Sequence, residues 1–443
     1  MNIAMFTNTF IPHVGGVANS VKVFTDEYRS RGHRVMVIAP AFEHMPPDEE
    51  DVIRVSAIQN FNGSDFSASL GIPLGLSKKL EQFQVDIIHS HHPYLLGDTA
   101  LRTAASLNVP LVFTHHTMYE QYTHYVPGDS PRLRHFVIEL STGYANLCDH
   151  IIAPSESVAV ILHKRGVKTP VIVIPTGVDI ERFSREDGSV LRAELGIPSD
   201  ALVIGYVGRL APEKNLEFWA AAAVEFIRQS RRNHALIVGS GPSRKNVEDI
   251  FMKADVGDRL HCAGVLTGDR LVSAYQAMDI FVFTSKSETQ GMVLVEAMAA
   301  GVPVVALDAP GVREVIRDTV NGRLIEEEGI EPFVQALSSI ALILMPGDDE
   351  KCHFMREAAK STSREFSTAR SADKALELYQ HILDMERTTD MKRTTVRKEH
   401  HVLSSILRRI EEEWSIWSNR LSAAGKAVLG SSTGEEESEE SGR

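Results

Sequence analysis

The sequence predicts an α/β protein with two doubly wound parallel sheets in separate domains. The chain has 443 residues, more than the roughly 250–300 that one hydrophobic core usually supports. Short apolar runs rich in β-branched residues alternate with helix-like segments along it. Such alternation is typical of parallel strands whose connecting helices cover both faces of a sheet. The hydrophobic content of 43% is ordinary for a globular protein.

The strand-like runs fall into two sets. The first comprises residues 2–6, 34–39, 85–90, 111–116, 150–155 and 171–175, and the second comprises residues 202–208, 234–239, 260–264, 280–285 and 302–307. A polar segment at 175–187, with Pro175 and Gly177, separates the sets and predicts an interdomain link. We therefore expect domains at 1–178 and 179–365, with ligand sites beyond the carboxyl ends of the strands.

Charge, hydropathy and cysteine use exclude several classes of protein. The net charge of −13 argues against general nucleic-acid binding. No run of about 18 apolar residues predicts a membrane span, and no signal-peptide pattern opens the chain. The three cysteines are widely spaced without a metal-ligand pattern, which favours reduced thiols. We expect a cytoplasmic enzyme.

The most informative segment is 279–307, where Glu288 and Glu296 lie eight residues apart. The composition predicts a strand at 280–283 and a helix from Val293, so Glu288 lies in the connecting loop and Glu296 in the helix. The amides that open such a helix suit a phosphate. Ionised carboxylates accept hydrogen bonds and so suit the hydroxyls of a hexose and a ribose. Two solvated surface acids are the alternative.

Charged residues also follow the first strand of the second domain. Arg209 and Lys214 lie in the segment YVGRLAPEKNLEF, between that strand and the next helix. A guanidinium and an ammonium there would neutralise a diphosphate leaving group without a metal. Surface ion pairing is the alternative interpretation.

Glycines and histidines mark the strand ends of the first domain. Gly15 and Gly16 precede an amphipathic helix and permit close approach of a ligand, although no dinucleotide fingerprint is present. Five histidines follow two adjacent strands: His89, His91, His92, His115 and His116. They could bind zinc, but no acidic residue or cysteine completes a ligand set. Hydrogen bonding to a hexose is the favoured use, so we predict no metal site.

Together these motifs resemble the retaining GT-B glycosyltransferases of the E-x7-E family, known as group 1 or family 4, over about residues 1–384. The resemblance implies two Rossmann-like domains facing across a cleft, whose closure excludes water. It implies that Glu288 contacts the donor hexose, that Glu296 holds the ribose, and that the amides of Gly291, Met292 and Val293 hold phosphate.

The same resemblance gives roles to five further residues. Arg209 and Lys214 match the diphosphate-binding pair, His116 matches the histidine beside the donor sugar, and Gly15 and Gly16 match the glycines of the first loop. The expected catalytic set consists of Arg209, Lys214, His116 and Glu288. No cofactor is implied besides the nucleotide sugar, and the departing phosphate oxygen is expected to help deprotonate the acceptor.

The acceptor prediction depends on residues 114–127, which are similar to the same region of bacterial diacylglycerol glucosyltransferases. The similarity rests on Tyr119, Glu120, Tyr122, His124, Tyr125 and Pro127. We expect acceptor binding by Tyr119, Tyr122, His124 and Tyr125, because aromatic rings suit the boundary between headgroup and acyl chain. Transferases of sulfolipid or inositol lipids share parts of this segment. A packed loop without a lipid role is the alternative.

Two basic and apolar segments suggest peripheral attachment to the inner face of the cell membrane. Residues 69–83 combine leucines that look exposed with Lys78 and Lys79, and residues 131–136 add Arg132 and Arg134. Such faces attract anionic lipids. Ordinary amphipathic packing is the alternative.

The composition changes towards the C-terminus. A helix at about 366–384 is expected to cross back onto the first domain, as in the GT-B fold. Residues 385–443 are predicted to hold a polar linker, an amphipathic helix at 402–421 and a disordered acidic tail. The helical stripe consists of Leu403, Ile406, Ile410, Trp414 and Trp417. We favour docking of this helix on the enzyme or a partner over a bilayer surface.

The expected function is retaining, metal-independent transfer of glucose from UDP-glucose to a membrane lipid such as diacylglycerol. Another donor, GDP-mannose or UDP-sulfoquinovose, or a soluble acceptor is the alternative. Two other classes stay open: a UDP-sugar epimerase and a nucleotide-sugar sensor without turnover.

Overall fold

The computed structural model describes residues 1–13, 15–43, 45, 49–58, 68–69, 75–125, 129–184, 188–345, 349–394, 415–416 and 418–423. The chain forms two compact units. One consists of Met1–Pro175 and Ser371–Arg443, and the other consists of Thr176–Arg370. Each unit is built on its own sheet.

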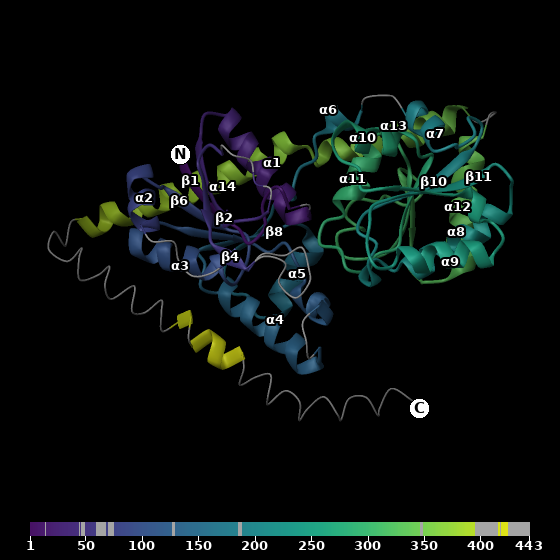
Figure 1. Cartoon of the computed structure of the whole chain (residues 1–443). Helices are drawn as coiled ribbons and strands as arrows, with labels where there is room; N and C mark the ends of the chain where they lie inside the picture. Colours follow the sequence, from purple (N-terminus) through teal and green to yellow (C-terminus); the bar gives the residue numbers. More distant parts are fainter. Residues whose placement is uncertain are drawn as a thin grey trace. The chain divides into compact units, whose positions relative to one another are not determined.

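The first unit has a seven-stranded sheet in the order β3-β2-β1-β6-β7-β8-β9, and every pair of neighbours is parallel (Figure 1). Its strands are β1 (Asn2–Phe6), β2 (Arg34–Pro40), β3 (Val52–Val55), β6 (Ile87–Ser90), β7 (Leu111–Thr114), β8 (His150–Ala153) and β9 (Val171–Val173). A short antiparallel pair, β4 (Ala57–Ile58) and β5 (Ala68–Ser69), lies outside this sheet. The order changes direction at β1, the switch point beside which ligands bind in such sheets.

Helices cover the first sheet. They are α1 (Gly16–Ser30), α2 (Leu76–Phe83), α3 (Leu96–Leu107), the 3-10 helix η2 (Tyr119–Tyr125), α4 (Pro131–Ala145), α5 (Glu156–Lys164) and α14 (Thr368–Thr394). Ser130 caps α4 and Ser155 caps α5, each accepting a backbone N–H bond three residues later. Two hydrophobic clusters fill the space on the faces of the sheet.

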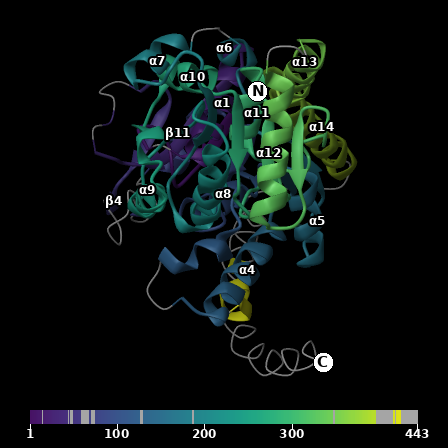
Figure 2. The same ribbon diagram turned by 90° about the vertical axis from the view of Figure 1, so that its right-hand side faces the viewer.

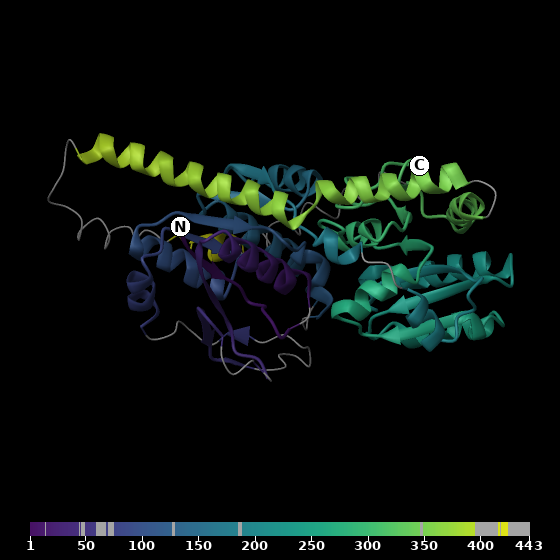
Figure 3. The ribbon, with the colours of Figure 1, turned by 90° about the horizontal axis from the view of Figure 1, so that it is seen from above.

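Helix α14 packs on the first unit through the cluster that contains Ile3 and Met5 (Figure 3). Tyr379 is fully buried in it, and its hydroxyl lies 2.6 Å from His89 Nδ1. The helix continues to Thr394, so residues 385–394 are helix and not the predicted linker. This segment is rich in polar residues, but its Lys, Arg, Glu and Met residues have good helix propensity, which explains the error.

The second unit has a six-stranded parallel sheet in the order β12-β11-β10-β13-β14-β15 (Figure 2). Its strands are β10 (Leu202–Val207), β11 (Asn233–Val238), β12 (Leu260–Gly264), β13 (Ile280–Phe283), β14 (Val304–Leu307) and β15 (Gly322–Ile325). The two parallel sheets confirm the predicted α/β class with two doubly wound domains. Prediction missed β3 and β15, two four-residue strands at sheet edges that each contain an arginine.

The helical elements of the second unit are α6 (Ile180–Phe183), α7 (Ser189–Glu194), η3 (Pro212–Lys214), α8 (Leu216–Arg228), α9 (Arg244–Lys253), η4 (Gly257–Arg259), α10 (Gly268–Gln276), α11 (Met292–Ala299), α12 (Ile330–Leu344) and α13 (Asp349–Glu365). Helix α6 lies within the segment predicted to be a plain polar link, where Asp179 caps it. One cluster, with Trp219 at 0% exposure, forms the core of the unit.

One expectation about the surface changes with the structure. In α2, Lys78 and Lys79 are exposed as predicted, but Leu76 and Leu80 are buried in the core and are not an exposed apolar face. Other leucines of that segment, at 70 and 74, lie outside the described residues. All three cysteines are free. Within the described ranges, no single helix is long and apolar enough to cross a bilayer.

Candidate active site

The loop between β13 and α11 carries the two glutamates of the E-x7-E segment. Glu288 lies in the loop and Glu296 in the helix. Gly291 caps α11 with a left-handed φ of 70°, and a Cβ there would come within 2.7 Å of Gly311 O. A residue with a side chain would therefore be both strained and obstructed. The amides of Met292 and Val293 then open the helix.

Lys214 and Glu288 form an ion pair between side chains that are only 16% and 17% exposed. Lys214 ends η3, which follows β10, and Glu288 follows β13. Because β10 and β13 are parallel neighbours, their carboxyl ends bring these loops together. The structure thus joins Lys214, which is predicted to bind the diphosphate, directly to Glu288, which is predicted to bind the hexose.

Arg209 pairs with Glu213, one turn further along the same loop. The guanidinium is 48% exposed while the carboxylate is 5% exposed, so the cation faces solvent and its partner is held inside. A guanidinium in this position can turn to an incoming phosphate with a small loss of side-chain packing.

Three hydroxyls tie the Glu288 loop to the Lys214 loop. Thr284 Oγ1 donates to Lys214 O at 3.2 Å and Asn215 O at 3.1 Å. Ser285 Oγ and Ser287 Oγ donate to Glu213 O at 3.4 and 3.2 Å. These bonds hold the two loops together, as a preorganised charge site requires.

Glu296 accepts a hydrogen bond from Tyr275 Oη at 2.6 Å. Burial raises the pKa of the Glu296 carboxyl to about 7, although the Tyr275 hydroxyl and the charge of Arg182 oppose that rise. Near neutral pH this group is therefore divided between its acid and carboxylate forms. The carboxylate can accept bonds from vicinal ribose hydroxyls.

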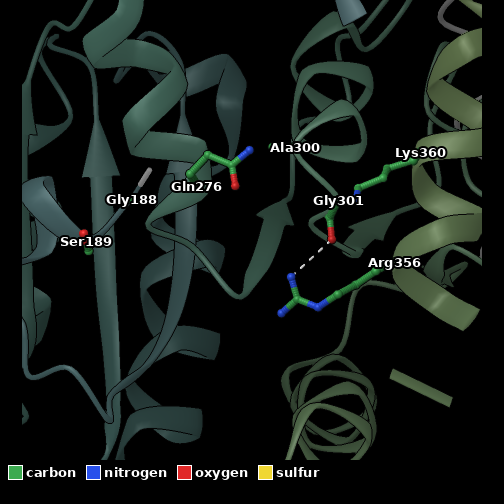
Figure 4. Close-up of a pocket in the computed structure, with 7 residues that line it drawn as sticks. All are labelled: Gly188, Ser189, Gln276, Ala300, Gly301, Arg356 and Lys360. Carbon is green, nitrogen blue, oxygen red and sulfur yellow. Dashed lines mark hydrogen bonds between the residues drawn. The ribbon is translucent and has the colours of Figure 1, made fainter. Parts of the chain in front are cut away.

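The second unit also has a pocket of about 440 Å³, shown in Figure 4. Gln276, Gly301, Arg356 and Lys360 line it, and Arg356 donates to Gly301 O at 3.4 Å. Gly301 follows the C-terminal end of α11, whereas the glutamate loop precedes its N-terminus. The pocket is therefore distinct from the donor residues.

The predicted histidines of the first unit form one neutral cluster, in which His89, His91, His92 and His115 are buried and His116 is partly exposed. His89 Nε2 lies 2.6 Å from Thr114 Oγ1, and His91 Nδ1 lies 2.9 Å from His116 Nε2. Burial lowers the pKa of His116 to about 3. It is thus an uncharged hydrogen-bonding group at physiological pH. Among the described residues, no three His, Cys, Asp or Glu side chains are grouped to hold a metal.

Gly15 is the N-cap of α1 and Gly16 is the first residue of that helix. Gly15 has an extended backbone with φ −173°, which other residues adopt freely. A Cβ on Gly16 would meet nothing within 4 Å. Neither the backbone nor close packing therefore requires a glycine at Gly16, and the open space above it leaves room for a ligand to approach the helix start.

The predicted acceptor residues lie on η2, which other parts of the unit hold in place. Tyr119 is 8% exposed, and its ring packs 5.3 Å from that of Tyr94 and 5.8 Å from that of His115. Glu120 forms an ion pair with Arg165 at 2.6 Å. Tyr122 is half-buried. The side chains of residues 124 and 125 lie outside the described set, as does residue 127.

Three residues of the site were not predicted: Glu213, Tyr275 and Gln290. Gln290 is buried and bonds both backbone groups of Thr176, accepting from its N–H at 2.7 Å and donating to its carbonyl. Tyr275 and Thr176 lie far along the chain from their partners, so no local spacing could reveal these bonds. Glu213 adjoins Lys214, and its four-residue spacing from Arg209 is the one available signal.

Residues 14–182 match the family described as Glycosyltransferase Family 4, and residues 189–362 match Glycosyl transferases group 1. The chain is 30% identical to the alpha-monoglucosyldiacylglycerol synthase of Streptococcus pneumoniae over 333 residues, 73% of this chain and 75% of that protein. It is 31% identical to a GDP-mannose-dependent alpha-mannosyltransferase of Mycolicibacterium smegmatis, over 75% of this chain and 86% of that protein.

The fold is similar to that of Anabaena HepE in complex with UDP-glucose. The TM-score is 0.66 at 22% identity, covering 86% of this chain and all of that chain. With the parallel sheets and the E-x7-E geometry, these matches establish that the chain belongs to the group 1 and family 4 glycosyltransferases of GT-B fold and is related to the diacylglycerol glucosyltransferases.

Proposed function

We propose that this glycosyltransferase moves glucose from UDP-glucose to diacylglycerol, with retention of anomeric configuration. The observation that carries the proposal is the prearranged Lys214 and Glu288 pair before α11, in a chain whose relatives include two alpha-monoglucosyldiacylglycerol synthases. In this reaction the bond between glucosyl C1 and the phosphate oxygen breaks. A bond from C1 to the acceptor hydroxyl forms on the same face, and the acceptor proton passes to the departing diphosphate.

The second unit would bind the donor. Arg209, Lys214 and the amides at the start of α11 would meet the diphosphate charge. Glu288 would accept bonds from the hexose and Glu296 from the ribose. On the first unit, neutral His116 would bond the sugar, and the open space at Gly16 would admit the donor. These groups can carry the leaving-group charge without a metal ion, so addition of EDTA should leave the rate unchanged.

Features of α4 support a lipid acceptor in a peripheral setting. Arg132 and Arg134 are exposed, with Arg134 in an ion pair with Asp129 at 2.8 Å, and Phe136, Val137 and Ile138 are half-buried on the same helix. Cations near a membrane surface contribute about 1 kcal/mol each to attraction by anionic lipids. Helix α4 also contacts η2, which carries the acceptor candidates. Attachment at the inner face of the cell membrane follows from this proposal.

The test supplies purified protein with radiolabelled UDP-glucose and vesicles that contain diacylglycerol. Labelled glucose in the lipid phase is the expected result. Label only in water-soluble products would contradict the lipid acceptor, and isomerised sugar without acceptor would favour an epimerase. Binding of UDP-glucose without any product would favour a sensor.

A second donor has direct support, because mannosyltransferases are among the relatives. GDP-mannose should therefore be assayed beside UDP-glucose on the same vesicles, with products identified by mass spectrometry. A higher kcat/KM with GDP-mannose would replace the glucose assignment. Nuclear magnetic resonance of the product's anomeric proton distinguishes the retained α-configuration from inversion.

A further inference from the structure

The described residues near the C-terminus, 415–416 and 418–423, are helical and lie against the first unit beside α4 (Figure 2). Ile416 is 3% exposed and Ala423 is 1% exposed, whereas Leu421 is 68% exposed. Asn419 and Arg420 bond to the unit. Positions 416, 419, 420 and 423 share one face of a helix, so a single inward stripe makes these contacts.

An ion pair secures one side of this segment. Arg420 pairs with Asp98, which lies in the first turn of α3 and whose side chain is 11% exposed. A carboxylate that is this well covered is costly to leave without a counter-charge. Ile416 adds an apolar contact, because it belongs to the same core cluster as Leu96 and Tyr144.

Helix α4 has a glycine, Gly143, at the point where the C-terminal segment packs against it. It lies in the last turn of α4, where a helical glycine ordinarily destabilises the helix relative to alanine. A Cβ built on Gly143 would overlap the side-chain amide of Asn419. The same amide donates to Leu140 O at 3.1 Å, one turn earlier on α4. The glycine thus leaves space that the C-terminal segment fills.

We propose that residues 415–416 and 418–423 form an intramolecular clamp, which docks on α3 and α4 and fixes the position of α4. The surface is specific for this segment because it combines three features: an apolar site for Ile416, a carboxylate for Arg420 and a glycine for Asn419. The clamp is a positioning device. It holds α4, which contacts η2, and so sets the geometry of the acceptor segment.

The clamp is tested in the full chain with substitutions at Gly143 and Asn419, because a side chain at position 143 would occupy the space that the Asn419 amide fills. Gly143→Ala should displace Asn419, lower the melting temperature and speed hydrogen exchange in peptides covering 415–423 and 131–145. Adding Asn419→Ala frees the space again, so the double variant should recover slow exchange and a higher melting temperature. Ser418→Ala, on the exposed face of the segment, is the matched control and should behave as the parent chain.

A rise in the melting temperature of Gly143→Ala would contradict the clamp. An uncovered helical glycine replaced by alanine should raise the melting temperature and leave exchange at 415–423 unchanged. Arg420→Gln gives a second measurement that does not depend on α4 folding: it should also speed exchange at 415–423, and unchanged exchange contradicts the ion pair. A concentration-dependent dimer in light scattering would assign the docked segment to a second copy and overturn the intramolecular clamp.

The effect on acceptor binding rests on the proposed lipid glucosyltransferase function. Gly143→Ala should raise the KM for diacylglycerol several-fold while leaving the KM for UDP-glucose unchanged, and the double variant should restore it. An unchanged KM for the lipid contradicts the positioning role. If no lipid is glucosylated at all, the proposed function fails, while exchange and melting still decide whether the clamp exists.

Discussion

Tyr275 and Glu296 are joined by a 2.6 Å hydrogen bond between the phenol and a carboxyl group whose pKa burial raises to about 7. Because the carboxylate is the form that accepts ribose hydroxyls, affinity for UDP should fall as the pH drops below 7, by up to about tenfold per pH unit. Titration calorimetry with UDP from pH 6 to 8.5 measures this dependence.

Tyr275→Phe should move that profile to higher pH, because the phenol donates to the carboxylate and lowers its pKa. UDP affinity should decline at pH 7 and recover at pH 8.5. Tyr144→Phe removes another buried phenol, in the first unit, and should leave the profile in place. A uniform loss of affinity at all pH values would show that Tyr275 acts through packing alone.

Replacement of Glu288 should separate nucleotide binding from transfer. Glu288→Gln removes the proposed hexose contact and should reduce turnover at least about tenfold, the effect of roughly 1.4 kcal/mol. It also releases Lys214 from its ion pair, so affinity for UDP should be equal or higher. Glu248→Gln, at an exposed ion pair on α9, serves as the control. Unchanged turnover would remove Glu288 from the donor site.

The histidine cluster should make the first unit labile to acid. Burial holds the pKa of His89, His92, His115 and His116 at about 3, so the unfolded chain binds more protons between about pH 6.5 and 3. The free energy of unfolding should therefore fall as pH decreases through this window, by at most about 1.4 kcal/mol per pH unit for each histidine. Urea unfolding at pH 7.5, 6.5 and 5.5 measures the slope.

His115→Phe should reduce that slope. The His115 ring is buried, neither of its nitrogens has a hydrogen-bond partner, and it packs against Phe113 and Tyr119. The variant removes one proton-binding site of the unfolded chain while keeping an aromatic ring of similar shape. A slope equal to that of the parent protein would show that His115 does not contribute to acid lability.

Local chemistry made much of the donor site predictable. A short apolar strand, a loop and a helix closed by a glycine place Glu288 and Glu296 from sequence alone, because each element depends on neighbouring residues. Hydropathy could not resolve β3 or β15, whose short edge strands carry arginines and are only partly buried. The five apolar residues of the predicted helical stripe between 403 and 417 lie outside the described set, so that part of the prediction stays a prediction.

The α/β class, the two sheets, the glycosyltransferase family and the residues that carry its donor motif follow from the order of the amino acids. The three-dimensional contacts add that Lys214 meets Glu288, that Tyr275 lowers the pKa of Glu296, that Gln290 holds Thr176 and that Asn419 fills the space beside Gly143. Strand and helix patterns are read over a few residues, whereas these contacts join positions 21 to 276 residues apart and depend on which strands become neighbours.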